Sequence, residues 1–302
     1  DEQNQVAKVH RNYSRTNNWL WENTATYKTT LADNHNITLL AGVTAQESRT
    51  EWMNGTKEDV PNNEEYLRYF SAANDEEPYL VGNASEWAMF SYLGRFNYNF
   101  KGKYLLTASV RRDGSSRFGD ENRFGVFPSA SVGYRISQED FMSGLPVISN
   151  LKLRAGWGQI GNQRIPMYQY TSTVSTGQNM HYVFSSAPGN VNSNRVFGAA
   201  SEGIGNTAIK WEVVESSNVG LDFGLFEGQI YGTVEYYEKN TKDMLVEEPI
   251  PDYTGMADVP FTNAGEVRNR GFEFSLNHKN VSGDFTYDIG VNLSTVDNEV
   301  LD

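Results

Sequence analysis

The side chains best suited to catalysis or metal binding are scattered along the sequence. The four histidines, His10, His35, His181 and His278, are isolated, and no two have the H-x-x-x-H spacing of a zinc site. The chain has no cysteine, which excludes disulfides and cysteine-based zinc sites. No P-loop or Rossmann glycine pattern is present. We therefore expect no enzyme and no catalytic, cofactor or metal site.

Paired carboxylates are the remaining candidates for acid–base chemistry. They occur at Glu64–Glu65, Asp75–Glu77 and Glu247–Glu248. Two such groups can hydrolyse glycosides. These pairs lie in polar stretches, however, which favours solvated charge or a loop calcium site.

Arginines gather around the polar stretch "DGSSRFGDENRFGVFPS", from Asp113 to Ser129. Arg111, Arg112, Arg117 and Arg123 are available to pair with carboxylates of neighbouring loops. We expect them to brace a loop, with direct ligand contact as the alternative. Gly114 and Gly119 are expected to make sharp turns, because glycine accepts positive φ.

Aromatic residues also stand among polar ones in two long stretches. They are Trp52, Tyr66, Tyr69 and Phe70, and then Tyr168, Tyr170, Tyr182 and Phe184. Such rings are either stacking platforms for sugars or peptides or the internal packing of ordered loops. Asn62–Phe70 predicts a short amphipathic helix.

Most of the chain alternates apolar and polar residues, the period of half-buried strands. About ten strands are predicted, most of them nine residues or longer: Trp19–Thr29, His35–Arg49, Glu86–Phe100, Tyr104–Arg112, Phe124–Ile136, Asn150–Ile160, Asn218–Phe226, Gln229–Asn240, Arg270–Lys279 and Phe285–Ser294. About 9–11 residues is the length that a tilted strand needs to cross a bilayer.

The connections between these strands alternate in length. Short ones are Leu31–His35, Lys101–Lys103, Glu227–Gln229 and Asn280–Asp284. Ser137–Ser149 is longer and has room for a helical turn. Between them come Thr50–Ser85, Arg112–Arg123, Gly161–Lys210 and Leu245–Asn269. Gly161–Lys210 has room for a further hairpin. Short turns on one side and long loops on the other are typical of outer-membrane barrels.

Alternation alone does not say whether the apolar side of the strands faces a core or lipid. Lipid is favoured because aromatics cluster near the short turns, as in an interfacial girdle. They are Tyr27, Tyr98, Phe100, Tyr104, Tyr134, Phe223, Phe285 and Tyr287. The polar side then lines a lumen, where candidates for touching a plug or substrate are Arg95, Asn97, Asn99, Ser109, Arg111, Lys152, Arg154 and Asp222.

The net charge indicates which kinds of macromolecule the protein does not bind. The 302 residues carry a formal charge of −13, and no run of Lys or Arg offsets it. A nucleic-acid partner is therefore not expected.

Four longer strings resemble the SusC/RagA family of TonB-dependent outer-membrane transporters of Bacteroidetes. They are Asn97–Met142, Leu151–Ile165 ("LKLRAGWGQIGNQRI"), Trp211–Leu245 and Asn263–Asn277 ("NAGEVRNRGFEFSLN"). They follow one another in the family's order over roughly residues 90–300.

The resemblance implies an all-β fold, an antiparallel transmembrane barrel segment of about ten strands from a larger plugged barrel. It implies import of oligosaccharides or peptides across the outer membrane of a Gram-negative bacterium, with a SusD-like surface lipoprotein and the TonB complex as partners. Residues 1–302 are expected to be part of the C-terminal barrel domain, with the plug and the final strands absent. The alternatives are a soluble or surface glycan-binding all-β module and a small passive porin.

Overall fold

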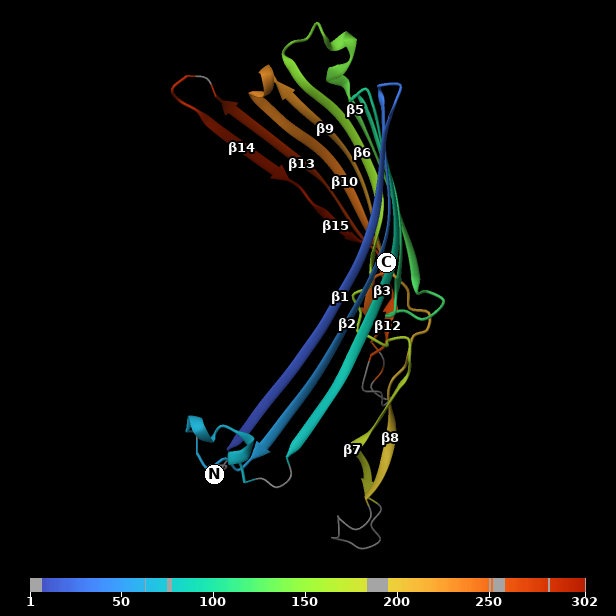
Figure 1. The fold of residues 1–302 in the computed structure, drawn as a ribbon, viewed down its shortest axis with the longest axis vertical. Helices are drawn as coiled ribbons and strands as arrows, with labels where there is room; N and C mark the ends of the chain where they lie inside the picture. Colours follow the sequence, from blue (N-terminus) through green and yellow to red (C-terminus); the bar gives the residue numbers. More distant parts are fainter. Residues whose placement is uncertain are drawn as a thin grey trace. The chain divides into compact units, whose positions relative to one another are not determined.

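The computed structural model describes residues 7–62, 64–74, 78–183, 195–249, 251, 259–281 and 283–301. The chain divides into two compact units. Unit 1 comprises Asp1–Trp21 and Ala45–Met89, and unit 2 comprises Glu22–Thr44 and Phe90–Asp302. Figure 1 colours the ribbon along the sequence.

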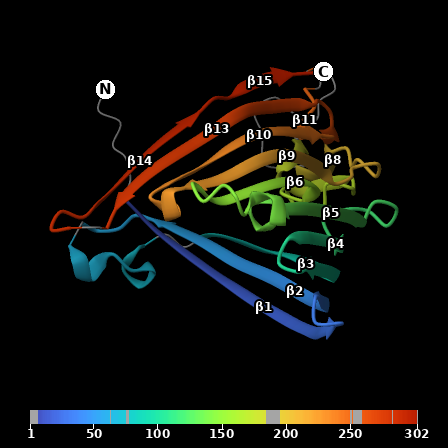
Figure 2. The ribbon, with the colours of Figure 1, turned by 90° about the horizontal axis from the view of Figure 1, so that it is seen from above.

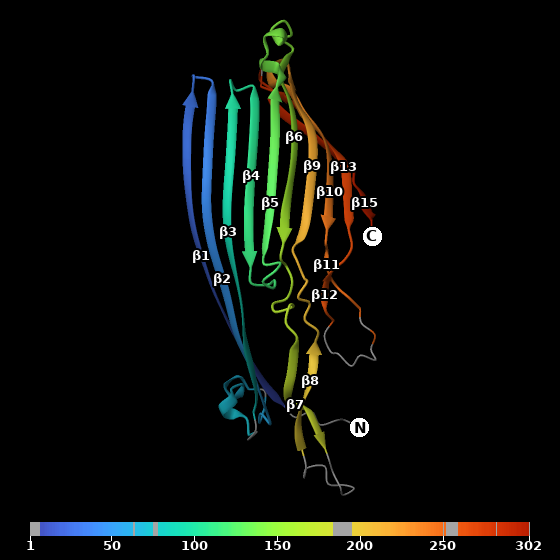
Figure 3. The ribbon, with the colours of Figure 1, turned by 90° about the vertical axis from the view of Figure 1, so that its right-hand side faces the viewer.

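One antiparallel sheet contains most of the strands, in the order β1-β2-β3-β4-β5-β6-β9-β10-β13-β14, and β15 pairs with β13 beyond the end of β14 (Figures 2 and 3). The strands are β1 (Lys8–Leu31), β2 (His35–Glu58), β3 (Tyr79–Phe100), β4 (Tyr104–Ser115), β5 (Phe124–Arg135), β6 (Ile148–Asn162), β9 (Glu212–Leu225), β10 (Ile230–Lys242), β13 (Val267–Asn280), β14 (Tyr287–Ser294) and β15 (Asp297–Val300). Each of the ten predicted strands corresponds to one of them. The predicted all-β fold is confirmed.

Two small sheets lie in the long connections. β7 (Thr173–Val183) pairs with β8 (Arg195–Gly203), and β11 (Leu245–Glu247) pairs with β12 (Phe261–Asn263). The hairpin allowed for in Gly161–Lys210 is therefore present. β11, β12 and β15 were not predicted, because three or four residues carry too little alternation to be recognised.

Strand ends near the first long loop differ most from the prediction. β1 begins at Lys8 instead of Trp19, β2 continues to Glu58, and β3 begins at Tyr79. The extra residues are mostly polar and alternate weakly. Side-chain contacts between β1 and β2 accompany the extension, such as the 3.0 Å hydrogen bond between Thr16 Oγ1 and Thr50 Oγ1.

The short connections match the prediction and gather at one end of unit 2 (Figure 3). In the β3–β4 turn, Lys101 and Gly102 have φ of 54° and 69°. Two successive left-handed residues make the type I′ turn that suits the twist of a hairpin. The helical turn expected in Ser137–Ser149 is present as two 3₁₀ helices, η3 (Ile136–Gln138) and η4 (Asp140–Met142), and η5 (Phe226–Gly228) joins β9 to β10.

The helix predicted over Asn62–Phe70 is wrong. Its described residues form the 3₁₀ turns η1 (Glu65–Leu67) and η2 (Phe70–Ala72), in unit 1. A small core there contains Val9, Val60 and Ala73, with Leu67 and Phe70 packed against it. The short 3₁₀ turns already pack Leu67 and Phe70, both partly buried, against this core.

In the described residues no helix is long and apolar enough to cross a membrane.

Candidate functional site

Strand register sorts the side chains of unit 2 onto two faces. In β4 and β5, Thr107 lies opposite Ser131 and Ser109 opposite Ser129, whereas Leu106 lies opposite Val132. Because side chains alternate along a strand, every pair on one face is followed by a pair on the other. We call the face with Ser109 the polar face and the face with Val132 the apolar face.

The polar face contains all eight predicted lumen residues. Asn97 accepts a 3.0 Å hydrogen bond from Thr107 Oγ1, and Ser109 Oγ lies 2.6 Å from Ser129 Oγ. Asn99 has a local task, since its Oδ1 accepts the Gly102 backbone N–H at 2.8 Å and so closes the β3–β4 turn.

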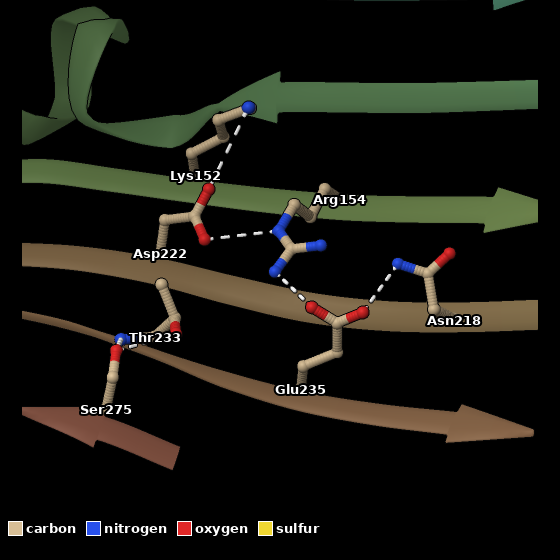
Figure 4. A network of polar contacts seen from close by, with 7 residues as sticks. All are labelled: Lys152, Arg154, Asn218, Asp222, Thr233, Glu235 and Ser275. Carbon is tan, nitrogen blue, oxygen red and sulfur yellow. Dashed lines mark hydrogen bonds and ion pairs between the residues drawn. The ribbon is translucent and has the colours of Figure 1, made fainter. Parts of the chain in front are cut away.

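A charged network crosses strands β6, β9 and β10 on this face (Figure 4). Lys152 Nζ lies 3.8 Å from Asp222 Oδ2, and Arg154 Nε donates to Asp222 Oδ1 at 3.1 Å. Arg154 also donates through Nη2 to Glu235, whose other oxygen accepts from Asn218 Nδ2 at 2.8 Å. The side chains of Arg154 and Glu235 are only 28% and 19% exposed. Half-buried charges of both signs thus neutralise one another along the polar face.

Gly220 makes room for this network. A Cβ added there would meet Arg154 Cζ at 2.9 Å, so the guanidinium lies directly over the glycine backbone. The position opposite Arg154 in the register is Gly220 itself. A larger side chain would therefore push Arg154 away from Asp222 and Glu235.

A second charged contact lies near the end of β4. Arg111 Nε donates to Asp113 Oδ1 at 2.6 Å and its Nη2 donates to Ser91 Oγ at 2.9 Å. Sequence reasoning named Arg111 but missed four acceptors and donors of these networks: Ser91, Asp113, Asn218 and Glu235. The alternation in Gln229–Asn240 predicts the face of Glu235, because its neighbours Val234 and Tyr236 lie on the apolar face.

The apolar face is exposed. Val132, Val219 and Phe272 are 54%, 53% and 59% exposed, and they belong to β5, β9 and β13. A water-soluble sheet would cover such a face with a second layer. Its exposure favours lipid over a hidden core.

Aromatic rings gather on the apolar face at the short-turn end, as predicted. We call His35, Tyr98, Phe100, Tyr104 and Tyr134 the aromatic belt. Tyr104 stacks on Tyr134 with centroids 5.0 Å apart, and His35 Nδ1 lies 2.7 Å from the Tyr98 hydroxyl. The other predicted girdle rings, Tyr27, Phe223, Phe285 and Tyr287, are exposed or half-buried.

An ion pair in the connection after β5 anchors this belt. Glu139 accepts hydrogen bonds from Lys103 Nζ at 3.0 Å and from the Tyr104 hydroxyl at 2.8 Å. The hydrogen bond from Lys103, followed by that from Tyr104, lowers the pKa of Glu139, and the same bond to Glu139 raises the pKa of Lys103. Amphipathic rings held by polar partners suit the level of lipid headgroups.

The long-loop end of unit 2 holds a buried cluster instead, which we call the mouth core. It consists of Phe118, Phe127, Ile165, Ile209 and Trp211. Phe118 and Ile209 are fully buried, and Phe127 belongs to the polar face, opposite Arg111. Three chain segments, 115–127, 165 and 209–211, are therefore fastened together over that face.

The four predicted mouth arginines have different contacts from those expected. Arg117 donates through Nη1 to the backbone carbonyl of Ile165, and burial lowers the pKa of its guanidinium. Arg123 pairs with Asp120 at 2.5 Å, and Arg112 lies 4.1 Å from the centroid of Phe124. Arg112 and Arg123 make these contacts within their own hairpin, and Arg111 bonds Asp113 of its own strand and Ser91 of β3. None of these printed contacts reaches a carboxylate of a neighbouring loop.

The positive φ expected of Gly114 and Gly119 is wrong, although Gly119 does begin a turn, in which its carbonyl accepts the Asn122 N–H at 3.2 Å. Neither has a positive φ among the described residues. Gly114 lies inside β4, where an added Cβ would meet Phe124 Cε1 at 2.4 Å. Space for the ring, and not backbone freedom, requires the glycine.

The loop aromatics divide between the two interpretations. Phe70 and Tyr170 pack against the cores of unit 1 and unit 2, respectively. Tyr66 and Tyr69 are 72% and 56% exposed, and Tyr168 is 43% exposed. Trp52 lies within β2 and not in a loop. Phe184 lies outside the described residues.

Acidic pairs form no metal centre in the described part of the chain, where no group of three or more His, Cys, Asp or Glu side chains could hold an ion. Asp75–Glu77 lies outside the described residues. Glu248 donates its backbone N–H to the Pro260 carbonyl at 3.0 Å, beside β11 and β12. The calcium alternative therefore gains no support from Glu64–Glu65 or Glu247–Glu248.

An antiparallel sheet with an exposed apolar face, a charged opposite face, and short turns and long loops at opposite ends defines the wall of an outer-membrane β-barrel. The family model described as TonB dependent receptor-like, beta-barrel matches residues 2–301. The chain belongs to this family, which places it in the outer membrane of a Gram-negative bacterium. The family consists of receptors and not of enzymes, in agreement with the expectation from the sequence.

Similar proteins refine the comparison. TonB-dependent receptor P39 of Formosa agariphila is 35% identical over 93% of this chain and 26% of its own length. TonB-dependent receptor SusC of Bacteroides thetaiotaomicron is 36% identical over 72% of this chain and 21% of its own. The predicted SusC/RagA resemblance is confirmed.

Solved structures agree. The structure of the RagAB peptide transporter superposes with a TM-score of 0.83 at 25% identity, covering 96% of this chain and 31% of that chain. The outer membrane transporter YddB from Escherichia coli shares the fold, with a TM-score of 0.60 at 9% identity over 95% of this chain and 34% of that one. The chain spans about a quarter of the length of the curated relatives that it matches.

Proposed function

We propose that this chain is part of the wall of a TonB-dependent transporter that imports large nutrients, such as oligosaccharides or peptides. The observation that supports the proposal most is the pairing of a lipid-suited apolar face with a neutralised, charged polar face on the same strands. Such a polar face offers hydrogen bonds to a plug or a hydrated cargo without a strong net field. Cofactors are not part of the proposal.

Residues 1–302 would form part of the C-terminal barrel domain of a longer protein, with the plug and the final strands outside this segment. The match of the barrel family to residues 2–301 supports this assignment. The strands at the two ends of the sheet order, β1 and β14, would pair with further strands, because a spanning sheet must satisfy its edge hydrogen bonds.

The partners would be a TonB complex and a SusD-like surface lipoprotein over the long loops. The resemblance to SusC and to the RagAB peptide transporter supports this arrangement. The mouth core is consistent with it, because ordered loop segments offer a partner a fixed surface.

The experiment uses the full-length protein in its own host, with the gene deleted and restored. Uptake of a fluorescent peptide mixture and of a fluorescent oligosaccharide mixture is measured with and without TonB. We expect restored uptake of one mixture, and loss of that uptake without TonB. Uptake that persists without TonB would favour the porin, and recovery of the protein without detergent would favour the glycan-binding module.

A further inference from the structure

A groove of about 470 Å³ lies on the apolar face of unit 2, across β5, β6, β9 and β10. The register arranges its outward side chains in two rows. The rows are Ala130, Trp157, Ser217 and Glu238, and Val132, Ala155, Val219 and Tyr236. The volume lies within the roughly 300–1,000 Å³ of small-molecule sites.

Differences in side-chain size create the groove. Ala130, Ala155 and Ser217 are small and form its floor. Trp157 and Tyr236, 39% and 37% exposed, rise beside them as walls. Side chains from four neighbouring strands thus form the hollow. None of these side chains belongs to the charged network on the other face.

A polar row lies directly beyond the groove, toward the long-loop end. Trp157 Nε1 donates to Glu215 Oε1 at 3.1 Å, and Lys242 Nζ lies 3.4 Å from Glu215 Oε2. Gln159 Nε2 also donates to Glu215, at 3.4 Å. An indole at the border between an apolar band and charged side chains marks the level of lipid headgroups. Long loops are extracellular in such barrels, so this is the level of the outer leaflet.

The hollow is apolar apart from Ser217 and Glu238, which lie in the row nearer the long loops, and at this depth it must be filled. Water is a poor occupant, because apolar cavities stay dry. A lipid chain that enters the groove gains packing contacts that a flat surface lacks, and packing is the main attraction between apolar surfaces inside a bilayer. A protein partner is disfavoured, because eight side chains are far fewer than the roughly 20–30 residues that each side of a stable interface contributes.

We propose that this groove binds one acyl chain of an outer-leaflet lipid, whose headgroup lies beside Glu215 and Lys242. The groove is continuous with the exposed apolar face and is open to it. The site is independent of the cargo and of the transport direction, and it concerns the bilayer partner alone.

The test is photo-crosslinking in the full-length protein in native outer membranes. A benzophenone amino acid replaces Tyr236 in one variant and Phe274 in a control. Phe274 lies on the same face of the adjacent strand, opposite Val234, and is 36% exposed, against 37% for Tyr236. Mass spectrometry identifies what is attached. We expect lipid at position 236 in roughly tenfold higher yield than at 274, the ratio that a preference of about 1.4 kcal/mol produces.

A second change fills the floor. In Ala155→Leu the added side chain occupies the groove, and lipid attachment at position 236 should fall to the level at 274. Ala41→Leu makes the same change on the apolar face in β2, outside this groove, and should leave attachment at 236 unchanged. Equal yields at 236 and 274 in the unfilled protein would mean ordinary surrounding lipid and would overturn the proposal. Attachment of position 236 to a protein, a second copy included, would overturn it too.

Discussion

The mouth core and the aromatic belt are both rich in aromatic rings, but they lie at opposite ends of unit 2 and on opposite faces of its sheet. In the mouth core, Phe127 faces the polar side and is covered by Phe118 and Trp211, whose ring centroids lie 5.0 Å apart. In the belt, Tyr104 and Tyr134 face the apolar side and stay partly exposed. Phe127 and Tyr134, which are seven residues apart on β5, thus have opposite surroundings.

The number of residues between the two rings explains this difference, because side chains alternate between the faces of a strand. Phe127 and Tyr134 are an odd number of residues apart, so they point to opposite faces. Loops fold back over the polar face at the long-loop end, whereas at the short-turn end Glu139 bonds the Tyr104 hydroxyl and leaves the Tyr104 and Tyr134 rings partly exposed. The mouth core is therefore held by burial, and the belt by ring stacking and hydrogen bonds.

The largest effect should follow truncation of the mouth core. Trp211→Ala removes a 6% exposed ring and the hydrogen bond from its Nε1 to the Arg123 carbonyl at 3.2 Å. We expect a local loss of about 3–5 kcal/mol, typical of large-to-small changes in a core. Hydrogen exchange in segment 115–123 should accelerate, while exchange in β9 and β10 stays close to wild type. Unchanged exchange in 115–123 would contradict a core that fastens the loops.

Arg117→Ala should have the next largest effect, because the Ile165 carbonyl loses its charged donor. Leaving a buried acceptor without this partner costs about 1–3 kcal/mol. Arg123→Ala is the control, since its exposed pair with Asp120 contributes about 0–1 kcal/mol. Protease cleavage of the loop in intact cells measures both. Uptake lost in Arg117→Ala with normal cleavage and normal surface level would favour ligand contact over a brace.

Tyr134→Leu tests the belt with a smaller effect. Leucine keeps an apolar side chain but removes the ring stacked on Tyr104, which is worth about 0.5–1.5 kcal/mol beyond its area. Thermal unfolding in detergent should show a modest decrease in Tm. Exchange in segment 115–123 should stay at the wild-type rate. A faster rate there would mean that the two ends are energetically coupled.

The smallest effect concerns pH at the ion pair of the belt. The pKa of Glu139 is lowered in the folded state, so its contribution is fully present above the ordinary value of 4.5 and is lost as pH falls through the lower folded pKa. The pKa of Lys103 is raised, so its contribution is present below 10.5 and is lost as pH rises through the higher folded pKa.

The Tm difference between wild type and Glu139→Gln measures this contribution. It should be constant from pH 6 to pH 8 and shrink on acidification below pH 4.5. A difference that instead grows on acidification would show that the sign assigned to Glu139 is wrong.

Much of this architecture could be predicted from the sequence, because alternation sets both strand position and face. All eight lumen candidates, from Arg95 to Asp222, were placed on the correct face by period two alone. The partners of Arg154 were less accessible. Glu235 is 81 residues away, and only the pairing of β6 with β9 and of β9 with β10 brings it within reach. Register between distant strands is a property of the whole sheet, and no local pattern near Arg154 encodes it.

The mouth core was missed for a different reason. Ile165, Ile209 and Trp211 belong to irregular segments without periodicity, and Phe118 looks like an isolated ring in a polar loop. Gly114 was misjudged because glycine was associated with turns, whereas here it stands aside for the Phe124 ring. Four rings of the belt, Tyr98, Phe100, Tyr104 and Tyr134, were predicted correctly because they follow the alternation of the strands, and His35 was not predicted.

The hairpin β7–β8 pairs with itself and, in the described residues, with no strand of the wall. The wall closes beneath it, since Asn162 and Glu212 are paired at the point where the chain leaves and returns. Insertions or deletions in the hairpin therefore leave the hydrogen-bond ladder of β6 and β9 unshifted. The hairpin can therefore vary in length and sequence during evolution, which changes the extracellular surface but not the strands that cross the membrane.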